Sequence, residues 1–196
     1  MENRSLKPMV AVPRLPRPGR VASAAAIALA AASILAACGS GATQAKSAAQ
    51  WAKSGRVAQR AGHYAIAISD YKAALKINPS DVYTLYDLGD AQQFMGDVAD
   101  AQTNYAAVLS LASLTGPNRG LVETTMYNLA IIDLKSDPAA AKSLLSRVVA
   151  ISPNDGPARM DLGKALLALG ERAAAQVQVA KAIQLDPSLR SVAPKF

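Results

Sequence analysis

GHYAIAISDY (residues 62–71) and GDVADAQTNY (residues 96–105) decide the fold of this 196-residue chain. The two stretches share three residues that recur 34 positions apart: Gly62, Ala67 and Tyr71 return as Gly96, Ala101 and Tyr105. Further along, Pro153 returns as Pro187 at the same spacing. A fixed period of this size predicts a repeated supersecondary unit that buries its apolar face only against its neighbours.

The composition favours helices over strands. Hydrophobic residues make up 51% of the chain but aromatic residues only 5%. Alanine is a strong helix former, whereas sheets favour β-branched and aromatic side chains. The sequence also shows no strand-like alternation, so we expect an all-α fold.

Period and residue types together resemble the tetratricopeptide repeat (TPR), a helix-turn-helix unit. This resemblance implies a right-handed superhelical solenoid of about four repeats, at residues 48–81, 82–115, 121–155 and 156–189, followed by a tail at 190–196. A loop is expected at residues 116–120 (GPNRG) because of its glycines and proline. Small residues of the family pattern, such as Gly89 and Ala101, are expected where paired helices approach most closely.

The first part of the chain reads as an export signal. Residues 1–20 are basic and proline-rich, and residues 21–37 are uncharged and mostly alanine. The next residues complete Leu35-Ala36-Ala37-Cys38, which resembles the lipobox of bacterial lipoproteins. The resemblance implies removal of residues 1–37, lipid attachment (palmitate among the acyl chains) at Cys38, and a short tether at 38–47. Ordinary signal cleavage nearby and an uncleaved membrane helix are the alternatives.

Charge and cysteine content narrow the possible partners. Five of the 21 basic and one of the 14 acidic residues precede residue 38, which leaves a net charge of +3 for the rest of the chain instead of +7. A basic surface for nucleic acid is therefore not expected. Cys38 is the only cysteine, which excludes an internal disulfide.

In TPR proteins the first helix of each repeat lines a concave face. Carrying the family positions over gives seven candidate partner-binding residues: Tyr83, Tyr86, Asp90, Phe94, Tyr127, Met160 and Lys164. The first repeat adds five further positions, namely Ala49, Ala52, Arg56, Gln59 and Arg60. Tyrosine combines contact area with a polar tip, which suits binding. The alternative is that some of these rings pack between helices.

A TPR subtype that clamps a terminal carboxylate uses Lys and Asn, but those positions hold Ala52, Arg56, Asp87 and Asp90 here. We therefore expect a short apolar or aromatic segment as the ligand, and a helix is one form that such a segment can take. No catalytic residue, metal site or cofactor is expected, since the only histidine, His63, falls in a repeat turn.

The expected function is that of a membrane-anchored, non-enzymatic scaffold that binds a protein or peptide partner. The chain is similar to TPR lipoproteins of pilus assembly and secretion, including pilotin-like subunits. Many Gram-negative lipoproteins that stay at the inner membrane carry an aspartate after the lipidated cysteine, but Gly39 stands there in this chain. The lipoprotein resemblance therefore implies the outer membrane in a Gram-negative cell, or the outer leaflet of the cytoplasmic membrane in a Gram-positive one. The alternative is a self-assembling structural lipoprotein, a homo-oligomer formed through its C-terminal repeat.

Overall fold

The computed structural model describes residues 45–196. The predicted signal peptide, the lipidation site at Cys38 and most of the tether lie outside these residues. Residues 46–196 form one compact unit.

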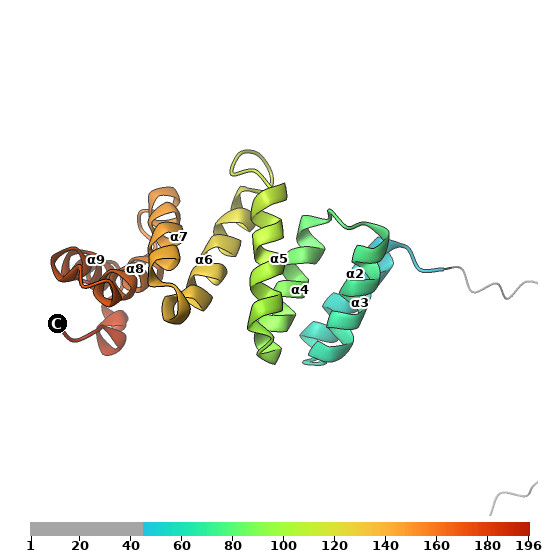
Figure 1. Cartoon of the computed structure of the whole chain (residues 1–196), viewed down its shortest axis with the longest axis horizontal. Helices are drawn as coiled ribbons and strands as arrows, with labels where there is room; N and C mark the ends of the chain where they lie inside the picture. Colours follow the sequence, from blue (N-terminus) through green and yellow to red (C-terminus); the bar gives the residue numbers. More distant parts are fainter. Residues whose placement is uncertain (1–44) are drawn as a thin grey trace, which may run out of the picture. The chain divides into compact units, whose positions relative to one another are not determined.

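This unit consists of helices arranged one after another along the chain (Figure 1). The eight α-helices of the described residues are α2 (Ala48–Arg60), α3 (Tyr64–Ile77), α4 (Val82–Met95), α5 (Val98–Leu111), α6 (Arg119–Ser136), α7 (Pro138–Ile151), α8 (Gly156–Ala168) and α9 (Arg172–Leu185). A short 3-10 helix, η1 (Pro187–Val192), follows them. The expected all-α solenoid of four helical hairpins is confirmed.

Local chemistry sets the helix ends. Ser47 begins α2 with a reciprocal capping box, in which its side chain accepts from the Gln50 backbone and the Gln50 side chain accepts from the Ser47 backbone. Gly96 ends α4 with a φ of 85°, a left-handed conformation that favours glycine. Pro138 opens α7, where its missing N–H is harmless, and Asp137 caps that helix. The loop expected at residues 116–120 instead runs over residues 112–118, because α5 ends at Leu111 and α6 already begins at Arg119.

Within each hairpin the two helices cross at small residues. A Cβ atom added to Gly89 would lie 2.9 Å from the Tyr105 ring and 3.4 Å from the Ala101 carbonyl oxygen. In the last hairpin, a Cβ at Gly163 would lie 2.5 Å from Val179. Ala101 is fully buried. The close approach expected at the small family positions is therefore confirmed.

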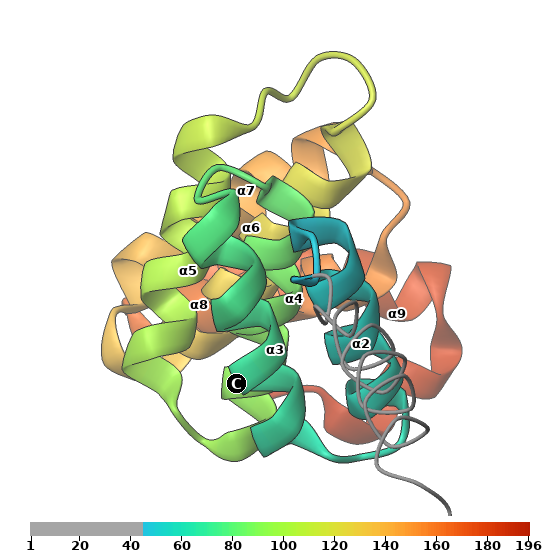
Figure 2. The same ribbon diagram turned by 90° about the vertical axis from the view of Figure 1, so that its right-hand side faces the viewer.

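Successive hairpins stack through apolar clusters, and Figure 2 shows the stack from its N-terminal end. One cluster joins α3 to α4 and contains Ala67, Tyr71, Leu88 and Ala91. A second joins the last two hairpins and is built around Ala130, Leu145, Leu162 and Leu166. Stacking thus buries the apolar faces that a single hairpin would leave in water.

The C-terminal segment covers part of the last hairpin. Leu189 and Ala193, in and just after η1, pack against the cluster of Met160, Val179 and Ala182. The sequence suggested only a short tail here. Among the large hydrophobic side chains of α9, that of Val177 alone stays mostly exposed. This helix therefore offers little bulky apolar surface to a second copy.

Candidate functional site

The predicted aromatic residues occupy different environments on the first helices of the repeats. Phe94 is 66% exposed and Tyr83 50% exposed, so both present ring surface to solvent. Tyr86 and Tyr127 are half-buried. The Tyr86 ring packs against the buried Tyr105 ring at a centroid distance of 5.9 Å, so the alternative of packing between helices holds for it in part.

Polar side chains bridge α2 and α4. Arg56 Nη1 lies 3.3 Å from Asp87 Oδ2, and Gln59 Nε2 donates to Asp90 Oδ2 at 2.6 Å. Burial raises the pKa of the Asp87 and Asp90 carboxyls, although their hydrogen bonds to Arg56 and Gln59 oppose this shift. Asp90, predicted as a binding residue, is therefore already engaged in joining two repeats.

Asn128 holds α4 to α6. Its Nδ2 donates to the Tyr86 hydroxyl at 3.2 Å and lies 3.5 Å from the Tyr105 hydroxyl. The Tyr105 hydroxyl in turn donates to Gln93 Oε1 at 3.0 Å. Burial raises the pKa of both tyrosines, so both hydroxyls stay neutral at physiological pH.

The fourth repeat departs from the predicted site. Met160 is 1% exposed because η1 folds over it, so the prediction that it faces a partner is wrong. The Tyr127 hydroxyl donates to Asp161 Oδ2 at 2.8 Å, and Lys164 Nζ lies 2.8 Å from Asp161 Oδ1. Tyr127 and Lys164 thus share one carboxylate that the sequence did not single out.

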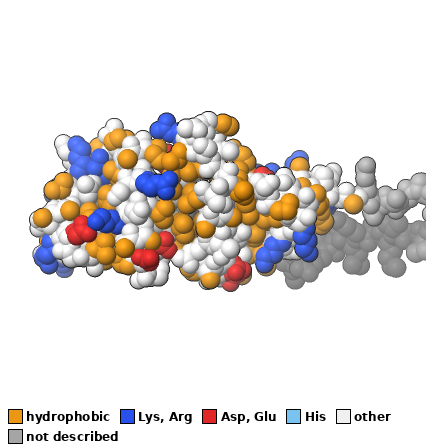
Figure 3. All heavy atoms as spheres, turned by 45° about the horizontal axis from the view of Figure 1, so that its top comes forward, with side chains coloured by type: hydrophobic (Ala, Val, Ile, Leu, Met, Phe, Trp, Pro, Cys, Tyr) orange, Lys and Arg blue, Asp and Glu red, His pale blue; other side chains and the backbone are white. Residues whose placement is uncertain are grey.

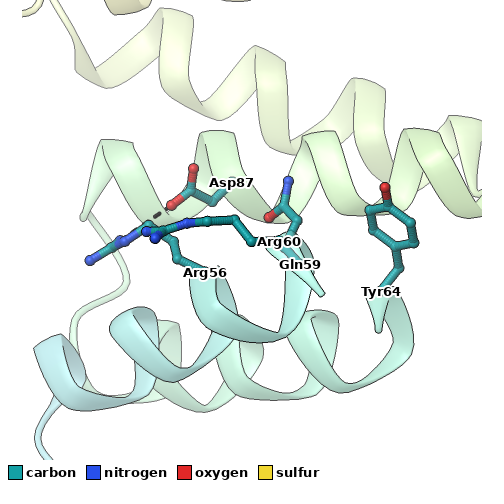
Figure 4. A pocket seen from close by; sticks show the side chains of 5 residues that line it. All are labelled: Arg56, Gln59, Arg60, Tyr64 and Asp87. Carbon is teal, nitrogen blue, oxygen red and sulfur yellow. Dashed lines mark hydrogen bonds and ion pairs between the residues drawn. The ribbon is translucent and has the colours of Figure 1, made fainter. Parts of the chain in front are cut away.

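Several shallow hollows lie along the first helices of the first three repeats. Arg56, Gln59, Arg60, Tyr64 and Asp87 line one of them, shown in Figure 4. In that view the guanidinium groups of both arginines lie at the end beside Asp87, and Tyr64 lies at the other end. This hollow is therefore polar and positively charged on one side.

The next hollow, of about 460 Å³, is lined by Asp90, Gln93, Phe94 and Asn128. Phe94 stacks on Tyr64 with ring centroids 5.0 Å apart and an interplanar angle of 8°. The stacked pair therefore contributes one ring to each of the two neighbouring hollows. Arranged in this way, the face can take up a polar group and an apolar group side by side.

A third hollow lies beyond Gln93 and is more apolar. Val98, Ile131 and Ile132 line it, together with Gln93, Lys135 and Ser136. At the opposite end of the face, Tyr83 lines a hollow that also contains Ala49, Ala52, Arg56, Asp81 and Asp87. Arg56 and Asp87 line both the Tyr83 hollow and the hollow of Figure 4, and Gln93 lines both of the other two. The candidate site is therefore a chain of shallow depressions, which we call the groove.

Two comparisons with known proteins, one with family models and one with solved structures, agree with this architecture. Family models described as tetratricopeptide repeat match residues 51–81, 81–154 and 135–191. Residues 51–191 are tetratricopeptide repeats. No curated protein matches the chain.

Several solved structures are similar to this TPR domain. A crystal structure of MamA is 25% identical, with a TM-score of 0.64 over 71% of this chain and 73% of MamA. MamA from Desulfovibrio magneticus RS-1 is 26% identical, with the same TM-score over 71% of this chain and 76% of that one. YrrB, described as a TPR protein with an unusual peptide-binding site, is 21% identical, with a TM-score of 0.64 over 71% and 69% of the two chains.

Two features of the TPR groove escaped the sequence reasoning. Asn128 was missed because the first helix of repeat three is shifted in register, although its place next to Tyr127 was a usable signal. Val98, which the sequence reasoning did not consider, opens α5, and its side chain is 44% exposed beside Ile131. His63, by contrast, is an exposed residue at the start of α3, where the sequence placed it.

Charged side chains are dispersed over one face of the TPR domain. On the face drawn in Figure 3, small groups of basic and acidic side chains lie among hydrophobic and uncharged ones. A nucleic-acid-binding face carries Lys and Arg clustered in a patch or stripe. This face has no such stripe.

Proposed function

We propose that this protein is a TPR scaffold that binds a segment of a partner protein in the groove formed by α2, α4 and α6. The observation that carries the proposal is Phe94, a large aromatic side chain that is 66% exposed between two hollows. Exposed aromatic residues with polar neighbours are typical of binding surfaces. The similarity to YrrB, described as a TPR protein with an unusual peptide-binding site, is consistent with this proposal.

The α2–α6 part of the groove is better suited to a ligand than the α8 end. Tyr127 and Lys164 are occupied by Asp161, and Met160 is covered by η1. Phe94 and Tyr83 keep large exposed areas. A partner segment therefore lies across the first three repeats in this proposal.

Photocrosslinking tests where the partner binds. Benzoylphenylalanine at Phe94 is expected to crosslink a partner in cells, because Phe94 lines one hollow and stacks on Tyr64, which lines the next. The matched control is the same residue at Ile66 on α3, which is 56% exposed and lines none of the groove hollows described above. Equal crosslinking from both positions, or from neither, would contradict binding in the groove.

The anchor is the second part of the proposed function. We infer from the Leu35-Ala36-Ala37-Cys38 motif that Cys38 is lipidated and that the chain serves in assembly at a bacterial envelope, such as pilus or secretion machinery. Several acyl chains on one residue give stable membrane attachment. Among the helices of residues 45–196, none has the length and apolar character needed to cross a bilayer.

Labelling with palmitate tests the anchor. The wild-type chain expressed in a bacterium is expected to incorporate labelled palmitate and to partition into detergent, whereas Cys38→Ser incorporates none. A serine variant still labelled, or a wild-type chain released unlabelled, would exclude lipidation at this residue. Tyr83→Ala serves as the control, since it changes the groove and leaves the motif intact.

A further inference from the structure

The hollow in Figure 4 has unused hydrogen-bond donors. Arg56 meets Asp87 through Nη1, and its side chain remains 41% exposed. Arg60 lines the same hollow, is exposed, and forms no ion pair within residues 45–196. Each guanidinium carries five N–H donors in a planar fork that matches a carboxylate. The hollow can therefore accept an anionic group without breaking the Arg56–Asp87 pair.

The charge balance favours a single negative charge in this hollow. It contains two guanidinium groups and one carboxylate, that of Asp87. Asp90 borders the adjacent hollow and already accepts a hydrogen bond from Gln59 at 2.6 Å. A group with one negative charge balances the remaining positive charge of this hollow, whereas a doubly charged phosphate would exceed it.

The apolar part of the same ligand fits beside Phe94. The Phe94 ring stacks on Tyr64, and Tyr64 lines the arginine hollow. Phe94 itself lines the next hollow, together with Gln93 and Asn128. A more apolar hollow beside that one is lined by Val98 and Ile131. A single partner segment could fill both hollows. Its carboxylate would enter the arginine hollow, and a bulky apolar side chain a few residues away would enter the hollow beside Phe94.

We propose that the partner segment carries a carboxylate that binds Arg56 and Arg60, followed or preceded closely by a large apolar residue that packs on Phe94. This inference rests on the proposed function and specifies the chemistry of its ligand. The source of the carboxylate is either an acidic side chain or the C-terminus of the partner. Of the two arginines, Arg60 is the one that is free to bind the carboxylate with its whole guanidinium group, because Asp87 pairs with Arg56.

Selection from a phage-displayed library of random 12-residue peptides tests the ligand chemistry. The full chain in mild detergent is expected to enrich peptides with Asp or Glu near Leu, Ile, Phe or Met. A selected peptide, synthesised with a free and with an amidated C-terminus, then distinguishes a terminal from a side-chain carboxylate. Fluorescence polarisation measures its dissociation constant with each variant.

Arg60→Gln is the decisive variant, because it leaves the Arg56–Asp87 pair in place. It is expected to weaken binding of the selected peptide about tenfold, as for loss of a charged hydrogen bond. Added salt should reduce that difference. Lys76→Gln on α3 is the matched control, since it removes one exposed positive charge in the last turn of its helix, as Arg60 lies in the last turn of α2.

The outcomes separate this inference from the proposed function. Peptides that lose affinity with Phe94→Ala but bind Arg60→Gln like wild type would overturn the carboxylate site and leave groove binding intact. Failure to enrich any peptide, or binding unaffected by both Phe94→Ala and Tyr83→Ala, would overturn both. A dimer in sedimentation that Arg60→Gln dissociates would show instead that a second copy occupies the hollow.

Discussion

Replacing Tyr105 with alanine is expected to lower the free energy of unfolding by about 3–5 kcal/mol, the range for removing a large aromatic side chain from a core. Tyr105 is fully buried between α4 and α5 and fills the space that Gly89 leaves open. The substitution also removes the hydrogen bond to Gln93. Since Tyr105 further contacts Tyr86 and Asn128 of the groove, the cavity would loosen the joint between repeats two and three.

Urea denaturation followed by circular dichroism measures this loss. Tyr83→Ala is the matched control, because Tyr83 is half exposed and its hydroxyl donates to the exposed Asn118 side chain. We expect the control to change stability by about 1 kcal/mol or less. Equal effects of the two substitutions would mean that Tyr105 does not occupy the hairpin core. A repeat array can unfold in steps, so the first transition is the one to compare.

Gly163→Leu is expected to destabilise the last hairpin by about 3 kcal/mol, at the upper end of the range for overpacking. A Cβ at this position already lies 2.5 Å from Val179 Cγ2 and 3.3 Å from the Ala175 carbonyl oxygen. Val179 can change rotamer, but the backbone of Ala175 cannot move away unless α8 and α9 separate. Thermal unfolding monitored at the helix signal measures the effect.

Gly120→Leu is the control for this prediction. Gly120 also lies in a helix, α6, but a Cβ there meets nothing within 4 Å. Because leucine has a higher helix propensity than glycine, the control is expected to be neutral or to stabilise by up to about 1 kcal/mol. If Gly163→Leu melts at the wild-type temperature, the two helices do not cross at this residue.

Contacts between residues close in sequence made most of the fold predictable. The Gly62 turn and the Ala101 crossing depend on neighbours in the same hairpin, so their residue types carry the information directly. The 34-residue period then places each hairpin against the next. In the second repeat the same logic located Tyr83 and Phe94 on the exposed face.

By itself, then, the sequence determined the hairpin, its repetition and the chemistry available to the concave face. Only the tertiary structure decided which of those side chains stay available. Met160 is buried because η1 folds back from the end of the chain, and Tyr127 is occupied because Asp161 lies opposite it in the next repeat. Pairing between repeats and the path of an irregular segment depend on three-dimensional packing, which a period does not encode.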